Sequence, residues 1–351
     1  MKQLALTYDD IQLVPGYSEI ESRKNINLKT LVTRRYGLRN PLVASPMDTV
    51  CDSKMAIEMM KLGGLGIIHR FMSIEEQIKE VLRVKIARTQ EMYESWGVND
   101  NWHADLKQIP IAAAVGANGD FYERAKELVK AGADIILIDV AHGHHKNVKD
   151  SIGRIKSIDP YVDVIAGNIA TFQAARDLQE WGADGLRVGI GGGSLCTTRV
   201  KTGFGIPNVT CIEEIVRTSA IPVMADGGIR SSGDIAKALA LGASTVMIGS
   251  LIAGTEESPG SIVEKSTGLY KRYRGAASLE TKMAHGQEQR NVEGESTIIP
   301  YKGGVKYIVE GLLDGIRSAL SYAGAEDLST YYPDWVQVTN AGQNEAKPHL
   351  I

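Results

Sequence analysis

The chain has 351 residues, of which 43% are hydrophobic and 23% are charged, and this is the composition of a globular protein with a core of ordinary size. Its 39 lysines and arginines nearly balance its 42 aspartates and glutamates, so the net charge of −3 indicates neither a nucleic-acid-binding groove nor a membrane-binding face. Asp9 and Asp10 lie where a signal peptide would need an apolar run, and no stretch approaches about 18 apolar residues, so a cytoplasmic protein is expected.

Short apolar runs alternate with amphipathic stretches along most of the chain, which is typical of repeated β-α units around a parallel sheet. Eight strands are predicted, at residues 41–44, 66–69, 111–115, 135–139, 162–166, 185–188, 222–225 and 245–248. Helices are predicted between them, for example at 121–131, 171–181 and 232–241.

A weak internal repeat supports this count of strands. The segments AGADIILID, WGADGLRVG and LGASTVMIG each place a glycine and an alanine at a helix end, immediately before a buried strand. A doubly wound sheet shows the same alternation, but it seldom needs eight units. We therefore predict a (β/α)8 TIM barrel that spans residues 1–351 as a single domain.

Three segments fall outside the barrel rhythm. Residues 87–108 are too short and too polar for an inserted domain and are predicted to form a loop with a helical piece. Residues 262–304 are rich in charge and glycine, and they are predicted to form a mobile flap above the C-terminal face of the barrel. Residues 333–351 are predicted to form an extended tail.

The loop after the sixth strand, GIGGGSLCTTR, is the most unusual segment of the chain. Functional residues of such barrels cluster where strands end in loops. Glycines let backbone amides approach an anion and adopt dihedral angles that a side chain forbids. Cys196 stands there beside the hydroxyl of Thr198 and the cation of Arg199, a setting that suits a nucleophile. For an isolated GGG-x-x-C the alternative is a flexible loop with a buried structural thiol.

Two further turns follow the last two strands. Gly227 and Gly228 come after the seventh strand, and Gly249 and Ser250 come after the eighth. Backbone amides and a hydroxyl at these two places predict a cup for a phosphate group. In isolation, either pair is more often a simple β-α turn.

The long segment GIGGGSLCTTRVKTGFG resembles the catalytic loop of the IMP dehydrogenase and GMP reductase family. The resemblance extends through YDDIQLVP, SPMDTV, DGGIR, GSLIAGTEESPG and YRGAAS, so that it covers residues 6–325. It implies a homotetramer that binds a purine nucleotide, GMP or IMP, together with a nicotinamide cofactor. It also implies that Cys196 attacks C2 of the purine and forms a covalent thioimidate.

The resemblance implies roles for individual residues. Substrate contacts are implied for Ser45, Met47, Ser194, Asp226, Gly227, Gly228, Gly249, Ser250, Tyr273 and Gly275. Cofactor contacts are implied for Asp139, Val140, Ala141 and Arg290. A monovalent cation, potassium, is implied on the backbone carbonyls of Gly191, Gly193 and Cys196, although Gly192 stands where most relatives have proline.

The family contains two activities that share the covalent intermediate. The dehydrogenase passes hydride from IMP to NAD and then activates a water with an Arg-Tyr pair on a long flap, whereas the reductase releases ammonia from GMP and uses NADPH. Between YRGAAS and VEG this chain has only LETKMAHGQEQRN, without an Arg-Tyr pair. RNVEG resembles the reductase segment, which implies that Glu293 and Thr198 protonate the departing amine and that Arg290 contacts the 2′-phosphate of NADPH.

Other segments leave alternatives open. SPMDTV, GGLGIIHRFMSIEEQ and YRGAASLE are more similar to the dehydrogenase. The tandem regulatory (CBS) domain that dehydrogenases usually insert after strand two is not expected, because only residues 87–108 occupy that place. The reductase with NADPH is therefore predicted, an IMP dehydrogenase with NAD and without the regulatory domain is the alternative, and a non-catalytic purine-nucleotide sensor is the second alternative.

Overall fold

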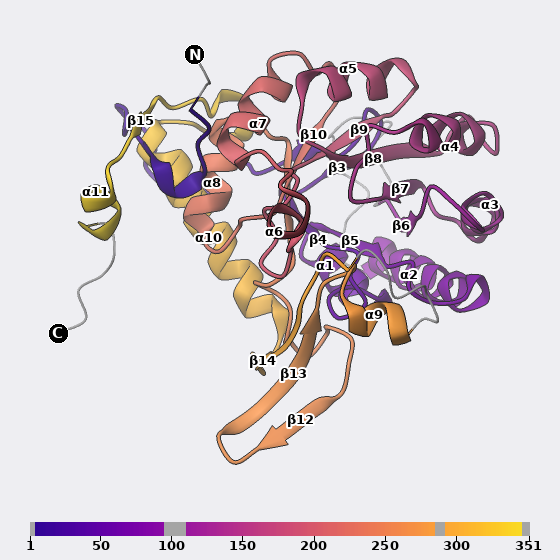
Figure 1. The fold of residues 1–351 in the computed structure, drawn as a ribbon. Helices are drawn as coiled ribbons and strands as arrows, with labels where there is room; N and C mark the ends of the chain where they lie inside the picture. The colour runs from indigo at the N-terminus through magenta and orange to yellow at the C-terminus, as the bar shows by residue number, and fades with distance from the viewer. Residues whose placement is uncertain (1–3, 95–109, 285–291, 346–351) are drawn as a thin grey trace.

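Eight parallel strands close into a barrel, as predicted (Figure 1). The structure is a computed structural model that describes residues 4–94, 110–284 and 292–345. Around the barrel the strands follow chain order, and the last pairs with the first. They are β4 (Leu42–Ala44), β5 (Leu65–Ile68), β6 (Ala112–Val115), β7 (Ile135–Asp139), β8 (Asp163–Ile169), β9 (Gly185–Val188), β10 (Val223–Asp226) and β11 (Thr245–Ile248). All eight coincide with predicted strands.

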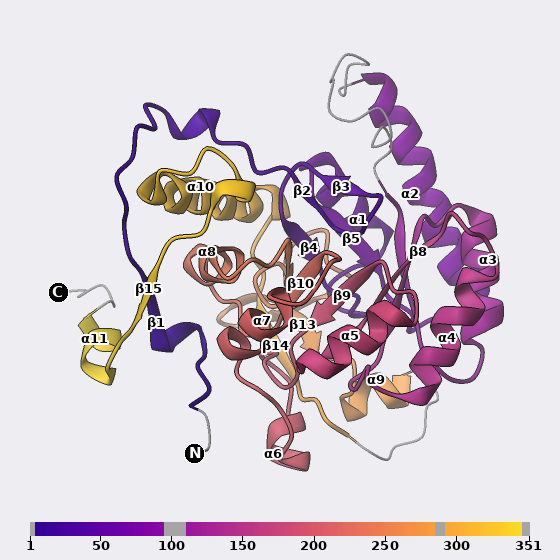
Figure 2. The ribbon, with the colours of Figure 1, turned by 90° about the horizontal axis from the view of Figure 1, so that it is seen from above.

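Helices surround the barrel and cover its outer face (Figure 2). They are α1 (Ser53–Lys61), α2 (Ile74–Glu94), α3 (Phe121–Ala131), α4 (Lys146–Lys156), α5 (Phe172–Glu180), α7 (Asn208–Val216), α8 (Ser232–Ala240) and α10 (Val305–Ala323), whereas the short helix α6 (Thr198–Thr202) has no buried residue and belongs to the loop after β9. Hydroxyl side chains cap the N-termini of α5 and α8. Thr171 accepts a hydrogen bond from the backbone amide of Ala174, and Ser231 accepts one from the backbone amide of Asp234. These caps explain why the sequence located the helix starts well.

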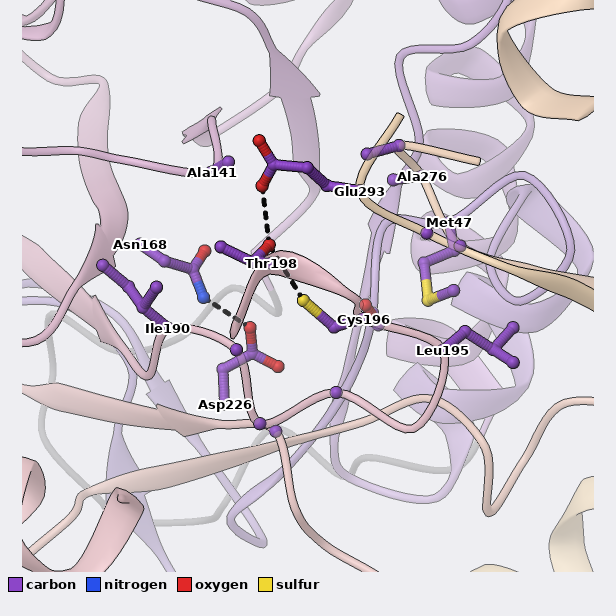
Figure 3. A pocket seen from close by; sticks show the side chains of 18 of the residues that line it. Met47, Ala141, Asn168, Ile190, Leu195, Cys196, Thr198, Asp226, Ala276 and Glu293 are labelled. Atoms are coloured by element: carbon purple, nitrogen blue, oxygen red, sulfur yellow. Dashed lines mark hydrogen bonds between the residues drawn. The ribbon is translucent and has the colours of Figure 1, made fainter. Parts of the chain in front are cut away.

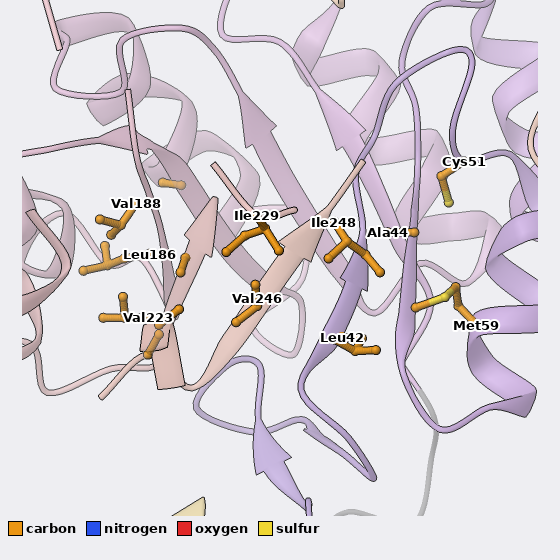
Figure 4. Close-up of a cluster of buried hydrophobic side chains, with 14 of the residues drawn as sticks. Leu42, Ala44, Cys51, Met59, Leu186, Val188, Val223, Ile229, Val246 and Ile248 are labelled. Atoms are coloured by element: carbon orange, nitrogen blue, oxygen red, sulfur yellow. The ribbon is translucent and has the colours of Figure 1, made fainter. Parts of the chain in front are cut away.

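Side chains of the strands form two apolar layers. Those that point outward, such as Leu42, Val246 and Leu186, are fully buried against the helices (Figure 4). Those that point inward, such as Val43 and Met247, fill the barrel interior. Because strand side chains alternate in direction, strands buried on both faces are apolar throughout, and this makes them visible in the sequence.

A short hairpin closes the N-terminal end of the barrel. Its strands are β2 (Thr30–Leu31) and β3 (Gly37–Leu38), which pair antiparallel. Val32 and Leu38 pack into the interior layer. At the rim, the fully buried carboxylate of Asp163 accepts hydrogen bonds from Thr33 Oγ1 at 2.6 Å and from Arg35 Nε at 2.7 Å. This end of the barrel is therefore sealed by apolar packing and by a saturated ion pair.

The segment predicted to be a flap contains a regular sheet. Its strands are β12 (Ile262–Lys265), β13 (Gly268–Arg274) and β14 (Ser296–Pro300), which pair antiparallel, and the short helix α9 (Leu279–Ala284) lies between the last two. The sheet projects away from the barrel body (Figure 1). The sequence does not show this sheet, because most of its side chains are at least partly exposed and it lacks an apolar face.

The remaining segments lie at the edges of the barrel. Residues 87–94 continue α2, and residues 95–109 lie outside the described part of the chain. In the region predicted as a tail, β15 (Trp335–Gln337) pairs antiparallel with β1 (Ile11–Leu13) and is followed by α11 (Asn340–Glu345). The 3-10 helices are η1 (Tyr8–Asp10), η2 (Arg23–Asn25) and η3 (Leu328–Thr330). Among the described helices, none is both long and apolar enough to span a bilayer.

Candidate active site

A cavity of about 420 Å³ opens at the carboxyl ends of the barrel strands. Most residues that the sequence analysis singled out meet there. They are Ser45, Met47, Asp139, Val140, Ala141, Gly191, Gly193, Ser194, Cys196, Thr198, Asp226, Gly227, Tyr273, Gly275 and Glu293. Segments that are far apart in the sequence thus contribute to one concave site, which is where a barrel of this kind places its chemistry.

The side chains of Cys196, Thr198 and Glu293 form a hydrogen-bonded chain along the wall of this cavity (Figure 3). The Sγ of Cys196 donates to Thr198 Oγ1 at 3.1 Å, and Thr198 Oγ1 donates to Glu293 Oε2 at 2.7 Å. Cys196 is partly exposed, so its sulfur is accessible from the cavity. A hydroxyl between a thiol and a carboxylate can pass a proton in either direction, because it both accepts and donates a hydrogen bond.

Backbone hydrogen bonds assemble this chain from distant segments. The amide of Thr197 donates to the carbonyl of Glu293 at 3.0 Å, and the amide of Glu295 donates to the carbonyl of Leu195 at 3.0 Å. The amide of Glu293 in turn donates to the carbonyl of Ala277 at 3.1 Å. The loop that carries the thiol and the segment that carries the carboxylate are therefore joined like two short strands.

The glycines of the loop make this arrangement sterically feasible. Gly189 has a φ of 134°, and a Cβ at this position would lie 2.0 Å from the carbonyl oxygen of Asp226. Only glycine fits there. Arg199, noted in the sequence as a cation beside Cys196, donates to the carbonyls of Ile190 and Ile206, so it stabilises the loop.

A buried cation links the two sides of the cavity. Arg187 Nε donates to Asp226 Oδ2 at 2.9 Å, and its NH1 group forms an ion pair with Asp139. Asn168 Nδ2 donates to the same Oδ2 of Asp226 at 2.7 Å (Figure 3). Burial opposes the charge of Arg187, but the two carboxylates outweigh it and raise the pKa of the guanidinium above its ordinary value.

Neither Arg187 nor Asn168 was among the predicted site residues. A signal for Arg187 was present, because the strand GLRV is otherwise apolar and a cation inside a barrel strand must find a carboxylate partner. Asn168 gave no comparable signal. Arg70 also lines the cavity, with its Nε 3.5 Å from Asp139 Oδ2, and Lys282 of α9 lines it as well.

A smaller cavity of about 130 Å³ adjoins the first. Three predicted residues line only this one, namely Gly228, Gly249 and Ser250, and several line both. The Tyr273 hydroxyl lies 2.9 Å from Ser194 Oγ. Burial raises the pKa of Tyr273, so its phenol stays protonated and remains a hydrogen-bond donor for a ligand. Arg290, predicted to contact a cofactor, lies outside the described residues.

Known proteins are similar to this chain in sequence and in structure. Residues 5–349 match a family model described as the IMP dehydrogenase / GMP reductase domain. An inosine-5'-monophosphate dehydrogenase of Cryptosporidium parvum is 41% identical, with 99% of this chain and 95% of that protein covered. A GMP reductase of Leishmania major is 31% identical, with 99% and 97% covered. The crystal structure of a cysteine-to-alanine variant of GMP reductase from Trypanosoma brucei, in complex with guanosine 5'-monophosphate, is 30% identical and covers 99% of this chain and 98% of that chain, with a TM-score of 0.91.

Proposed function

The chain belongs to the IMP dehydrogenase / GMP reductase family of oxidoreductases, and from that premise we propose that it is a GMP reductase. It would convert GMP to IMP and ammonia, with NADPH as the reductant. The observation that carries this proposal is the hydrogen-bonded chain from the Cys196 thiol through the Thr198 hydroxyl to the Glu293 carboxylate.

This hydrogen-bonded chain of three side chains suits the removal of an amine. As Cys196 adds to C2 of GMP, its proton can pass through Thr198 to Glu293, which leaves a thiolate as the nucleophile and a protonated carboxyl group beside it. The amino group of GMP must gain a proton to leave as ammonia, and the same hydroxyl and carboxyl can supply it. When bound, NADPH supplies hydride to C2, and the thiolate then departs to give IMP. The proton that the sulfur loses when it becomes a thiolate is thus the proton that the amine gains when it leaves.

The rest of the cavity accounts for nucleotide binding. Arg187 and Asn168 both contact Oδ2 of Asp226, so within the described residues Oδ1 remains for the ribose hydroxyls. The smaller cavity would hold the 5′-phosphate, and we call it the phosphate cup. Its lining includes five glycines and the hydroxyls of Ser45, Ser194, Ser250 and Tyr273, and backbone amides and hydroxyls are donors that suit a dianion. Met47 would pack on the purine.

The cofactor side rests on Asp139, Val140 and Ala141, which line the same cavity as Cys196. A carboxylate suits the ribose hydroxyls of a nicotinamide nucleotide. We assign Arg290 to the 2′-phosphate of NADPH from the sequence alone, since a guanidinium fork suits a phosphate.

Potassium would be held by carbonyl oxygens of the catalytic loop. The carbonyls of Gly191, Gly193 and Cys196 belong to one loop, and oxygen ligands suit a hard cation. The Gly193 oxygen already accepts the amide of Cys196 at 3.0 Å, but a carbonyl has a second lone pair. We further propose a cytoplasmic homotetramer, as the resemblance implies, and light scattering measures the assembly directly.

An IMP dehydrogenase is the second candidate, favoured by the relative of that name at 41% identity. The same Thr198 and Glu293 could take a proton from an attacking water. The reductase is preferred because the stretch between Ser278 and Glu293 contains no Arg-Tyr pair to activate that water.

Nicotinamide absorbance distinguishes the candidates, with purified protein, potassium, and either GMP plus NADPH or IMP plus NAD. Oxidation of NADPH with one ammonia released per turnover establishes the reductase. Reduction of NAD with IMP alone establishes the dehydrogenase. Silence in both assays, together with labelling of Cys196 that GMP blocks, identifies a nucleotide sensor.

A further inference from the structure

The segment that follows β11 forms one wall of the phosphate cup. Gly249 and Ser250 line the cup, and the chain then makes a tight turn in which the amides of Ile252 and Ala253 both donate to the carbonyl of Gly249. Such a turn leaves its later carbonyls without partners inside the turn itself. The groups that donate hydrogen bonds to these carbonyls therefore determine how rigid this wall of the cup is.

Lys302, just after β14, donates hydrogen bonds to two of these carbonyls. Its Nζ donates to the carbonyl oxygen of Ser250 at 2.7 Å and to that of Leu251 at 3.0 Å. Its backbone amide donates to the carbonyl of Gly254 at 2.9 Å, and the amide of Glu256 donates back to the carbonyl of Gly303 at 2.8 Å. Lys302 is thus held against the segment by backbone contacts, and its ammonium group is fixed on the turn.

Lys271 of β13 holds the next part of the same segment. This lysine is only 4% exposed, and its Nζ donates to the carbonyls of Thr255 at 2.9 Å and Ser258 at 2.6 Å. Tyr273 lies two residues further along β13, so both side chains point to the same face of the projecting sheet. The projecting sheet therefore contributes Tyr273 to the phosphate cup and Lys271 to the segment after β11, and Lys302, two residues after β14, binds the same segment.

We propose that Lys302 is a positioning residue for the 5′-phosphate of the nucleotide, acting through the turn at residues 249–251. The proposal rests on the nucleotide site proposed above. The ammonium group fixes the carbonyls of Ser250 and Leu251, so it fixes the position of Ser250, which lines the cup. A cation on the Ser250 carbonyl also polarises the peptide that it shares with the Leu251 amide, which makes that amide a stronger donor.

Charge supports the same assignment. Arg230 also lines the cup, but it forms ion pairs with Asp9 and Asp234 that offset its charge. Lys302 donates to neutral carbonyls, and within the described residues it forms no ion pair with a carboxylate. A phosphate monoester carries between about −1.5 and −2 charges at neutral pH, so the Lys302 charge adds to its binding.

The test measures binding rather than turnover. The full chain is prepared as Lys302→Met, which removes the ammonium group, and as Lys302→Arg, which keeps a cation. Lys306→Met is the matched control, because Lys306 lies four residues further along the chain, in the first turn of α10, and pairs with Glu310 at 3.8 Å. Calorimetry then gives the dissociation constants of each protein for GMP, for IMP and for guanosine, which lacks the phosphate.

Lys302→Met is expected to weaken the binding of GMP and IMP by about tenfold or more, since hydrogen bonds to a charged group are lost, while guanosine affinity changes by less than about twofold. Lys302→Arg should recover most of the loss, and Lys306→Met should bind like the wild type. Equal weakening of GMP and guanosine would show a merely structural role and overturn the proposal, as would unchanged GMP binding.

The same experiment separates this proposal from the reductase assignment. If the wild type binds GMP more tightly than guanosine but shows no turnover, the reductase assignment fails, and a selective loss of GMP affinity in Lys302→Met still supports the role of Lys302. If Lys302→Met does not fold, Lys302→Gln replaces it, because the glutamine amide keeps a donor but has no charge. A loss of GMP affinity in that variant, with guanosine unaffected, supports the proposal, and wild-type affinity contradicts it.

Discussion

The two ends of the barrel each contain an ion pair between an arginine and a largely buried aspartate, and they use it differently. At the N-terminal end, Asp163 is enclosed by Arg35 and Thr33, beneath the β2-β3 hairpin. At the C-terminal end, Arg187 is shared between Asp139 and Asp226, and both carboxylates border an open cavity. The same pairing seals one end and prepares the other for a ligand.

The difference lies in what is left unsatisfied. Both oxygens of Asp163 already accept hydrogen bonds from the protein, so that carboxylate has little capacity for a ligand. At the other end Arg187 fixes one oxygen of Asp226 and orients the other. A polar group in a structure indicates function when its geometry is fixed but its hydrogen-bonding capacity is not used up. Four substitutions test this distinction.

Cys196→Ala should have the largest effect, and only on chemistry. Without the thiol no covalent intermediate forms, so we expect turnover to fall by about 10⁴-fold or more. GMP affinity should stay within about threefold, because the phosphate and ribose contacts lie elsewhere. Stopped-flow absorbance and calorimetry measure the two quantities. Turnover above a few per cent of the wild type would exclude the covalent mechanism.

Glu293→Gln should slow the release of ammonia by about 10²- to 10³-fold, because an amide cannot hold and return the proton. Since Gln keeps the size of Glu and the backbone contact with Thr197, nucleotide binding should hardly change. Single-turnover measurement of ammonia isolates this step. An unchanged rate would remove Glu293 from the proposed mechanism.

Arg187→Met should damage both stability and activity. Removing the shared cation leaves Asp226 without its ion-pair partner and leaves Asp139 with Arg70, whose Nε is 3.5 Å away, which lowers the free energy of unfolding by about 3 kcal/mol. Denaturant unfolding measures that loss, and the KM for GMP should rise because Asp226 is no longer oriented. Loss of stability with an unchanged KM would make this pair equivalent to the one at the closed end.

Arg35→Met at the closed end should have the smallest effect. Its side chain is 38% exposed and can be replaced partly by water, so we expect a loss of about 1 kcal/mol in the free energy of unfolding. Because Asp163 begins β8 at the end of the barrel opposite the cavity, kcat/KM should stay within about twofold of the wild type. A large loss of activity here would show that the two ends are coupled.

The sequence predicted the barrel well and the site in part. Strands buried on both faces are largely apolar runs, and the glycine-rich loop that carries Cys196 has a composition that few structural loops share, so both were visible. The sheet of β12, β13 and β14 was missed because its side chains face solvent. The contacts of Arg187 and Lys302 were not visible because their partners are far apart in the sequence and are brought together only by the closed barrel.

The pairing of β1 with β15 has a consequence for folding. Ile11 pairs with Gln337, so the two residues are separated by 337 − 11 = 326 positions. A contact between residues so far apart in sequence loses chain entropy when it closes the loop between them, so we expect it to form late. During synthesis β1 must wait for almost the entire chain to emerge before it gains its partner. We expect backbone amides in this strand pair to exchange with solvent sooner than those of the barrel, since a sheet of only two short strands outside the closed barrel opens first.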